Sequence, residues 1–363
     1  MAEQGMFDPV LYSDFLARKN TRPLFSCMWE PMINPSAEIV SNASEDKILY
    51  AEHVQPKHIL DIADTVLKTL VQLEGDLPPA LQASGGHQWL EAICGCKIMA
   101  SDGQIWASHP DKNSLDDFLN APLHIEWEEK LLQCHTDMVN FANGRCFVAV
   151  PALHGPIDIL SAFVGVEELS YAIFDEPEKL KRALSKAGDV FCRVAGRLTD
   201  ALIPFRNGYC GRMYIYTDKA CATLQDDSSY MTSPAAFKEF LEPIERRIIE
   251  RMPCTVYHMH NSSLHLSPII AEYGMAAIQM SVDPNGPPME VQIAVYEEMK
   301  RKTPLVLSCW SLEDMELLRQ KLSPQGLALT FIPALDGCQI NGRGAFDDMP
   351  VWQEAYKNWM KLY

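Results

Sequence analysis

Several features common in proteins are missing from this sequence, and each absence excludes a class of structure or partner. No apolar stretch of about 18 residues is present, so the sequence predicts no membrane span. The 31 Lys and Arg are scattered rather than gathered into a stripe, and 48 Asp and Glu give a formal net charge of −17. Such a chain offers no basic surface for binding the phosphate backbone of a nucleic acid, so we expect no nucleic-acid partner. A G-x-G-x-x-G turn is also missing, which removes one reason to expect a Rossmann sheet.

The sequence also lacks the signs of secretion and of division into domains. Its start, "MAEQGMFDPVLYSDFLARKN", has no basic segment followed by an apolar run, so we expect a cytoplasmic protein. The 11 cysteines are an odd set in a long chain, which favours reduced thiols. Without repeats or a Gly/Ser-rich linker, residues 1–363 are interpreted as a single domain.

Short apolar runs alternate with amphipathic segments, and this alternation is typical of βαβ units around a parallel sheet. The expected helices include 233–252, which opens with Ser233 as N-cap and Pro234 in the first turn, and also 267–274, 290–302 and 311–323. The expected strands are 23–29, 146–153, 212–218, 255–261, 276–282, 304–310 and 327–335. Seven strands with helices between them favour an α/β fold of one (β/α)8 barrel, with an N-terminal extension and helical insertions.

In such a barrel the functional groups follow the C-terminal ends of the strands. His258 and His260 end one run, and residues i and i+2 of a strand point to the same side, so both rings would face the interior together. Cys338 follows the last run, and two histidines with a thiolate suit zinc with one position left open. Two alternatives remain at this point: the histidines are structural, and Cys338 only packs near its turn.

Several segments together resemble the uroporphyrinogen decarboxylase-like superfamily, and within it the zinc-dependent, corrinoid-linked methyltransferases. The segments are "WLEAICGCKI" (89–98), "IWASHPDKNSLDDF" (105–118), "PALHGPIDIL" (151–160), "DDSSYMTSPAAFKEFLEPIERRIIERM" (226–252), "YHMHN" (257–261) and "YGMAAIQMSVD" (273–283). The resemblance covers most of the chain and implies a zinc enzyme that moves a methyl group between a small substrate and the corrinoid (cobalamin) of a partner protein.

The resemblance places the zinc ligands at His258, His260 and Cys338, with His260 where the family has a cysteine. An imidazole in place of a thiolate makes the ion a harder Lewis acid, which we interpret as a shift from thiols towards an oxygen substituent such as a methyl ether. The family's decarboxylases carry an arginine-rich segment for substrate carboxylates, but 26–35 has no arginine. A metal-free decarboxylase or lyase, and a non-catalytic barrel that binds a corrinoid or tetrapyrrole, remain as alternatives.

Further residues are candidates because they lie at strand ends or match the family's segments. The expected acid, base or ligand carboxylates are Glu30, Glu91 and Asp226, although structural pairing or capping is the alternative for each. The residues expected to contact the substrate are Trp29, His154, Tyr216, Tyr230 and Cys309, and the aromatic ones have a core role as their alternative. Whether the chain forms a homodimer is open.

Overall fold

The computed structural model describes most of the chain. The described residues are 8–27, 39, 43–44, 46–70, 74–76, 78, 80–83, 88–102, 104–108, 113–332 and 349–363. Three of the predicted site residues, Trp29, Glu30 and Cys338, lie outside these ranges.

The chain has an α/β fold around a mostly parallel central sheet. Six parallel strands form that sheet, in the order β1 (Leu24–Cys27), β13 (Leu327–Phe331), β12 (Leu305–Cys309), β11 (Ala277–Val282), β10 (Thr255–His260) and β9 (Ala222–Gln225). A second parallel pair consists of β3 (Ala80–Gln82) and β6 (Phe147–Ala149). The first strand pairs with the last, and a parallel bridge between His154 and Gln225 links the chain after β6 to the end of β9. Among the described residues no sheet closes, so the closed barrel stays a prediction.

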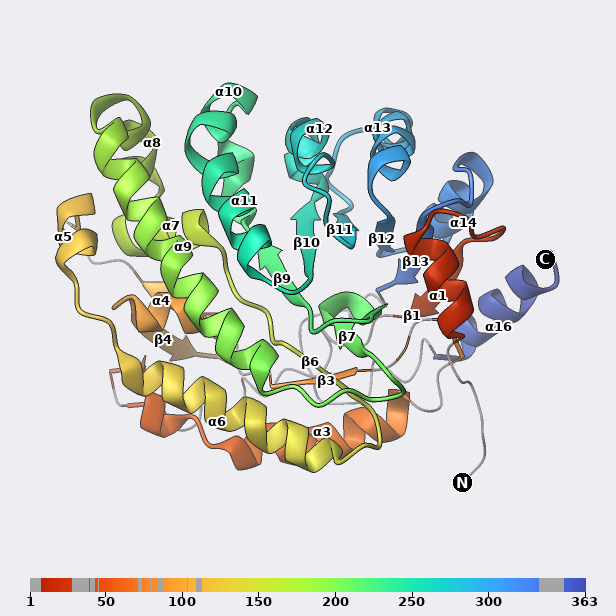
Figure 1. Ribbon diagram of the computed structural model, residues 1–363, viewed down its shortest axis with the longest axis horizontal. Helices are drawn as coiled ribbons and strands as arrows, with labels where there is room; N and C mark the ends of the chain where they lie inside the picture. Colours follow the sequence, from red (N-terminus) through yellow and green to blue (C-terminus); the bar gives the residue numbers. More distant parts are fainter. Residues whose placement is uncertain are drawn as a thin grey trace.

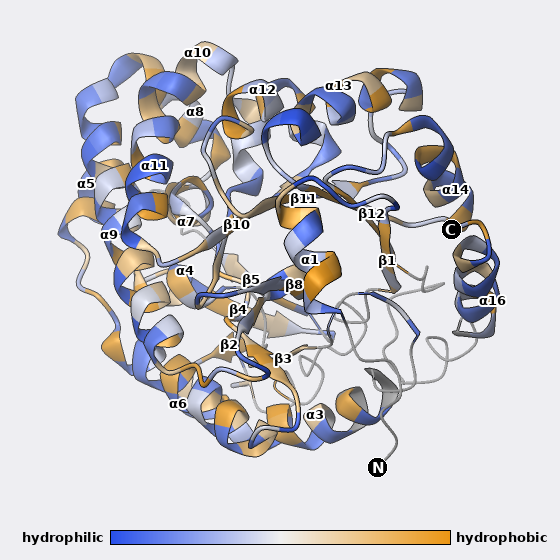
Figure 2. Cartoon of the chain, turned by 45° about the vertical axis from the view of Figure 1, so that its right-hand side comes forward, coloured by the Kyte–Doolittle hydropathy of each residue, from blue (hydrophilic) through white to orange (hydrophobic). Residues whose placement is uncertain are grey.

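Helices surround the strands as an outer layer, which Figure 2 shows as a ring. The longer ones are α3 (Pro56–Leu70), α6 (Ile125–Ala142), α8 (Val166–Asp175), α9 (Pro177–Asp200), α11 (Glu242–Arg251), α13 (Met289–Lys302), α14 (Leu312–Lys321) and α16 (Met349–Met360). The shorter ones are α4 (Trp89–Ile93), α5 (Leu115–Asn120), α7 (Pro156–Val164), α10 (Pro234–Ala236), α12 (Ser267–Ile270), η2 (Ala51–His53), η4 (Asp227–Met231), η6 (Asn261–Leu266) and the π-helical turn η5 (Phe237–Leu241). No helix in the described part of the chain has the length and apolar character needed to cross a bilayer.

Serine caps account for the starts of two helices. The Ser233 side chain accepts a hydrogen bond from the Ala236 amide at the start of α10, as predicted, and Ser311 does the same for Asp314 at the start of α14. The predicted helix 233–252 is confirmed as the continuous run α10, η5 and α11, and 290–302 and 311–323 correspond to α13 and α14.

Additions to the alternating pattern lie before β1 and between the parallel strands. The helix α1 (Pro9–Leu16) precedes β1, as the predicted N-terminal extension does. A small antiparallel sheet contains β2 (Ile48–Leu49), β4 (Lys97–Ser101) and β5 (Gln104–Ser108). An antiparallel hairpin consists of β7 (Tyr209–Gly211) and β8 (Ile215–Thr217), joined by η3 (Arg212–Tyr214). Figure 1 shows β9 to β13 side by side, with β3 and β6 below them.

The prediction that 212–218 is a strand of the parallel sheet is wrong. That segment forms η3 and β8 of the antiparallel hairpin, and the parallel strand next to β10 is β9, immediately after it. Alternating apolar residues favour any half-buried strand, parallel or antiparallel, so the pattern did not distinguish the two. The sequence analysis also missed β3, which is only three residues long.

Side chains on the inner face of the strands form layers whose polarity changes along the strands. Towards the N-terminal ends the layer is apolar and packs with Tyr12 and Phe15 of α1, and its strand members include Val256, Ala277, Val306 and Ala328. Two residues further along each strand the layer is polar: His258, Gln279, Ser308 and Thr330. The members of the polar layer are hydrogen-bonded in that order from strand to strand. The interior therefore changes from an apolar core to a hydrogen-bonded network beneath the C-terminal ends.

Asn20 links the chain before β1 to the chain before β13. Its amide nitrogen donates to the carbonyl oxygens of Arg22 at 2.8 Å and Pro324 at 2.6 Å, and its Oδ1 accepts from the Gly326 amide at 2.7 Å. We expect Asn20→Ala to lower the free energy of unfolding by about 2–3 kcal/mol, because buried groups lose their partners. Urea denaturation measures this effect. The matched control, Asn120→Ala, removes one exposed hydrogen bond to the Asp116 carbonyl oxygen on α5; equal losses in both variants would contradict the proposed link.

Candidate metal centre

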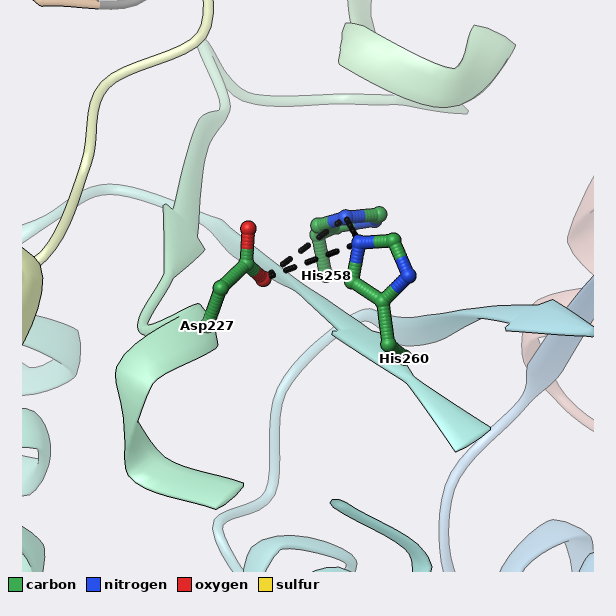
Figure 3. Close-up of side chains that lie close together, drawn as sticks. All are labelled: Asp227, His258 and His260. Atoms are coloured by element: carbon green, nitrogen blue, oxygen red, sulfur yellow. Dashed lines mark hydrogen bonds and ion pairs between the residues drawn. The ribbon is translucent and has the colours of Figure 1, made fainter. Parts of the chain in front are cut away.

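Two histidines at the C-terminal end of β10 point at each other. His258 and His260 lie on the same face of the strand, as predicted, and their Nε2 atoms are 3.2 Å apart (Figure 3). The Nδ1 of His258 is hydrogen-bonded to Oε1 of Gln279, and the Nδ1 of His260 to Oδ2 of Asp283 at 2.6 Å. Both Nδ1 atoms face acceptors and therefore carry their protons. When both rings are neutral, each directs the lone pair of its Nε2 towards the other ring.

The two rings differ in their surroundings. Burial lowers the pKa of His258 to about 4, so this ring is neutral at physiological pH. The hydrogen bond that His260 donates to Asp283 raises the pKa of His260, which is more exposed than His258. A carboxylate behind a histidine also makes the distal nitrogen a stronger donor to a metal.

Asp227, the first residue of η4, faces the histidine pair. Its Oδ1 lies 4.0 Å from the Nε2 of His258 and 3.9 Å from the Nε2 of His260 (Figure 3). The ligand atoms of the three residues all lie within 4.8 Å of one another. Imidazole nitrogen and carboxylate oxygen are both common zinc ligands, so the group offers a two-nitrogen, one-oxygen donor set for a divalent cation.

The neighbouring Asp226, predicted to be catalytic, faces elsewhere. It is almost fully buried, and its Oδ1 accepts a hydrogen bond from the Ile157 amide at the start of α7. Burial and the nearby Glu245 raise its pKa well above the usual range, which favours the protonated, uncharged form of Asp226. Gly155 lies against the Asp226 carboxylate, so closely that a Cβ at residue 155 would be 2.3 Å from it. A catalytic role for Asp226 stays a prediction.

His154 and Glu91, both predicted site residues, are in direct contact. The His154 Nδ1 is hydrogen-bonded to a Glu91 oxygen, and Glu91 is 2% exposed on α4. Burial lowers the pKa of His154, but the Glu91 carboxylate more than offsets this and raises it to about 9. His154 also lies beside Asp158 and Asp227, with ligand atoms within 4.8 Å, so this pair adjoins the histidine site. Burial raises the pKa of Asp158 to about 6.

The other predicted substrate contacts lie in different places. Tyr230 belongs to η4, the same short helix as Asp227, and is 54% exposed. Cys309 ends β12 and is fully buried, which raises the pKa of its thiol. Tyr216 packs on Tyr12 of α1 and on Phe147, the first residue of β6, so it lies towards the opposite ends of the strands from His260.

Sequence reasoning assigned no role at the site to three residues that contact or face the histidine pair. Gln279 and Asp283 hold the Nδ1 atoms, and Asp227 faces the Nε2 atoms. For Asp283 a signal was present, because it directly follows the predicted strand 276–282. For Asp227 the signal was its place in the segment 226–252, but the resemblance covers both aspartates of that segment and favoured Asp226.

The Glu91 and His154 pair predicts a pH-dependent contribution to stability. Because the pKa of His154 rises from about 6.5 in the unfolded chain to about 9, the stabilisation is complete below pH 6.5 and is lost as the pH rises through 9. We expect Glu91→Gln to lower the free energy of unfolding by about 2–3 kcal/mol at pH 6.5 and by much less at pH 10. Urea denaturation at both pH values measures this.

The exposed pair of His124 and Glu126 supplies the control. Glu126→Gln should change stability little at either pH, because solvent screens an exposed ion pair. A Glu91→Gln effect of the same size at both pH values would contradict an ion pair with His154.

Comparisons with known proteins add evidence on the fold. No protein-family model matches the chain, and no curated protein matches it. Nine chains of solved structures do match. One is a methyltransferase from Methanosarcina mazei, with a TM-score of 0.65 and 13% sequence identity, over 98% of this chain and 100% of that chain. At this identity the similarity establishes a shared fold over nearly the whole length of both proteins.

Proposed function

We propose that this protein is a zinc-dependent methyltransferase that moves a methyl group between a small substrate and the corrinoid of a partner protein. The observation that carries the proposal is the pair of Nε2 atoms of His258 and His260, 3.2 Å apart with both Nδ1 atoms engaged. The fold shared with a solved methyltransferase and the sequence segments described above support methyl transfer as the reaction.

Zinc fits the residues that are present. Two lone pairs directed at each other repel unless a proton or a cation lies between them. Two ligands of a tetrahedral zinc ion with bonds of about 2.0 Å lie about 3.3 Å apart, close to the separation of the two Nε2 atoms. We propose Cys338, which follows β13, as a further ligand. When bound, zinc would polarise the heteroatom that carries the methyl group, or lower the pKa of a thiol acceptor.

The protein's own residues prepare the site for this chemistry. Burial keeps His258 neutral, so that it donates to a metal without first losing a proton. Asp283 orients His260 and increases its electron donation. His154, held by Glu91, lies beside the site and is proposed as a contact for the substrate. Nitrogen and oxygen donors favour a hard Lewis acid, so we propose a methyl ether ahead of a thiol as the substrate.

The test combines metal content with methyl transfer. In the purified protein we expect about one zinc ion per chain. We also expect methyl transfer from a methoxy compound to cobalt(I) cobalamin, which leaves the hydroxyl compound, or from methylcobalamin to a thiol, which leaves cobalt(I). His258→Ala should reduce zinc to below about 0.2 per chain and abolish transfer, because the most buried donor is lost. Elemental analysis gives the zinc content, and the absorbance of the cobalamin gives the transfer.

His265→Ala is the matched control. This ring lies on η6 just beyond β10, but its Nε2 is hydrogen-bonded to the Thr232 carbonyl oxygen, away from the pair. The control should keep both zinc and activity. Wild-type protein without zinc, unchanged by His258→Ala, would contradict the metal site. A metal-loaded protein that transfers no methyl group to or from any methoxy compound or thiol would contradict the methyltransferase and favour a lyase or hydrolase.

A further inference from the structure

Two consecutive aspartates, Asp226 and Asp227, have opposite surroundings, and only the second faces the histidines. Asp226 is enclosed by the start of α7 and by Glu245. The Oδ1 of Asp227 is a buried atom without a hydrogen-bond partner in the described part of the chain. An unpaired buried carboxylate oxygen is strongly unfavourable, and a bound cation removes that penalty.

The distances between the three ligand atoms fit a single position for a metal ion. The three atoms, two Nε2 and one Oδ1, form a triangle with sides of 3.2, 3.9 and 4.0 Å. The nearest point equidistant from all three lies in their plane, about 2.2 Å from each, close to zinc–nitrogen and zinc–oxygen bond lengths of about 2.0–2.2 Å. A divalent cation at this point would contact all three residues without rearrangement of the strand.

Asp227 is held in this orientation by a hydrogen-bonded relay. The Arg212 Nη1 donates to Oε1 of Gln225 at 2.8 Å, and Nε2 of Gln225 donates to Oδ2 of Asp227 at 2.7 Å. Arginine can only donate, so it sets which end of the Gln225 amide faces it and leaves the amide nitrogen for Asp227. The relay therefore occupies Oδ2 and leaves Oδ1 directed towards the histidines.

The backbone around Asp227 is anchored as well. The buried Asp158 accepts hydrogen bonds from the amides of Asp227, at 2.8 Å, and Ser228, at 2.6 Å. A carboxylate at this position satisfies the free amides at the start of η4. Both the main chain and the side chain of Asp227 are thus fixed before any ligand arrives, as a metal site requires.

We propose that Asp227 is a metal ligand, and that Arg212 and Gln225 are positioning residues that act through it. This inference rests on the metal site of the proposed function and adds a ligand to the predicted set of His258, His260 and Cys338. The donors then include two imidazoles and a carboxylate, which is a harder set than one completed by thiolates. Such a set favours an oxygen-bearing substrate group over a soft thiolate.

The test measures metal affinity in the purified full-length protein by competition with a chromogenic chelator. Asp227→Ala should weaken zinc binding more than about 100-fold, and Gln225→Leu by about 10- to 100-fold, the usual effect of losing an outer partner. Arg212→Lys, which keeps a donor and a charge, should stay closer to wild type than Arg212→Met. The d–d absorption bands of Co²⁺-loaded protein should change in Asp227→Ala and Gln225→Leu, which a purely structural effect would not cause.

Asp175→Asn and Gln320→Leu are matched controls on exposed helix surfaces and should leave zinc affinity unchanged. Wild type that binds zinc, with Asp227→Ala within about threefold of its affinity, would overturn the ligand assignment. Loss in Asp227→Ala without any change in Gln225→Leu would overturn the relay. Wild type without zinc, unaffected by His258→Ala, would instead be a failure of the proposed function, so the two are distinguishable.

Discussion

The structure around the site depends on one close approach, that of the Nε2 atoms of His258 and His260. At 3.2 Å, two neutral imidazoles with protonated Nδ1 atoms repel each other unless something positive lies between them. The strand alone brings the rings to one face, but it does not set their tilt. Gln279 lies in the adjacent strand β11 and Asp283 directly follows it. Their hydrogen bonds set the tilt and the tautomer of the two rings.

The polar layer inside the sheet is explained by the need to hold the His258 ring in one orientation. A buried amide such as Gln279 is unfavourable unless its oxygen and its nitrogen both find partners. Its nitrogen donates to Ser308, whose hydroxyl is in turn hydrogen-bonded to Thr330. Three neighbouring strands thus contribute side chains whose shared effect is to fix the orientation of His258. The apolar layer beneath them, with Val306 and Ala328, has no such network and supplies hydrophobic stabilisation.

The carboxylates near the site differ in the partners of their oxygens. These partners distinguish the carboxylates that are held within the protein from the one proposed to bind a metal. Burial and the nearby Glu245 raise the pKa of Asp226, which favours its uncharged form, and Glu91 is paired with His154. Asp226, Glu91 and Asp227 each have one buried oxygen without a hydrogen-bond partner among the described residues. Asp227 differs because its other oxygen is held by Gln225 and the unpartnered one faces the two histidines. In an acidic chain, the direction in which an unpaired oxygen points is therefore more informative than the number of carboxylates.

The sequence predicted those parts of the fold and the site that depend on a local pattern of residues. The period of two in β10 placed both histidines on one face, and the runs that became β1, β6, β10, β11, β12 and β13 were recognised. The role of Asp227 was not predictable, because it depends on β9, a four-residue strand with the sequence "ATLQ" and a weak apolar pattern. Without that strand, the sequence contains no signal to separate Asp226 from Asp227.

The segment 212–218, wrongly predicted as a parallel strand, connects the antiparallel hairpin to the site through Arg212. As a parallel strand it would have placed Arg212 at the N-terminal end of the sheet, whereas the hairpin directs Arg212 to Gln225 at the end of β9. The turn that does this includes Met213, a buried residue with φ of 69°, in the left-handed region that L side chains rarely adopt. Such strain persists only where surrounding packing enforces it, and here Met213 is packed in the apolar layer with α1. The N-terminal core therefore stabilises the conformation that delivers the arginine, and packing at one end of the strands contributes to the orientation of Asp227 at the other.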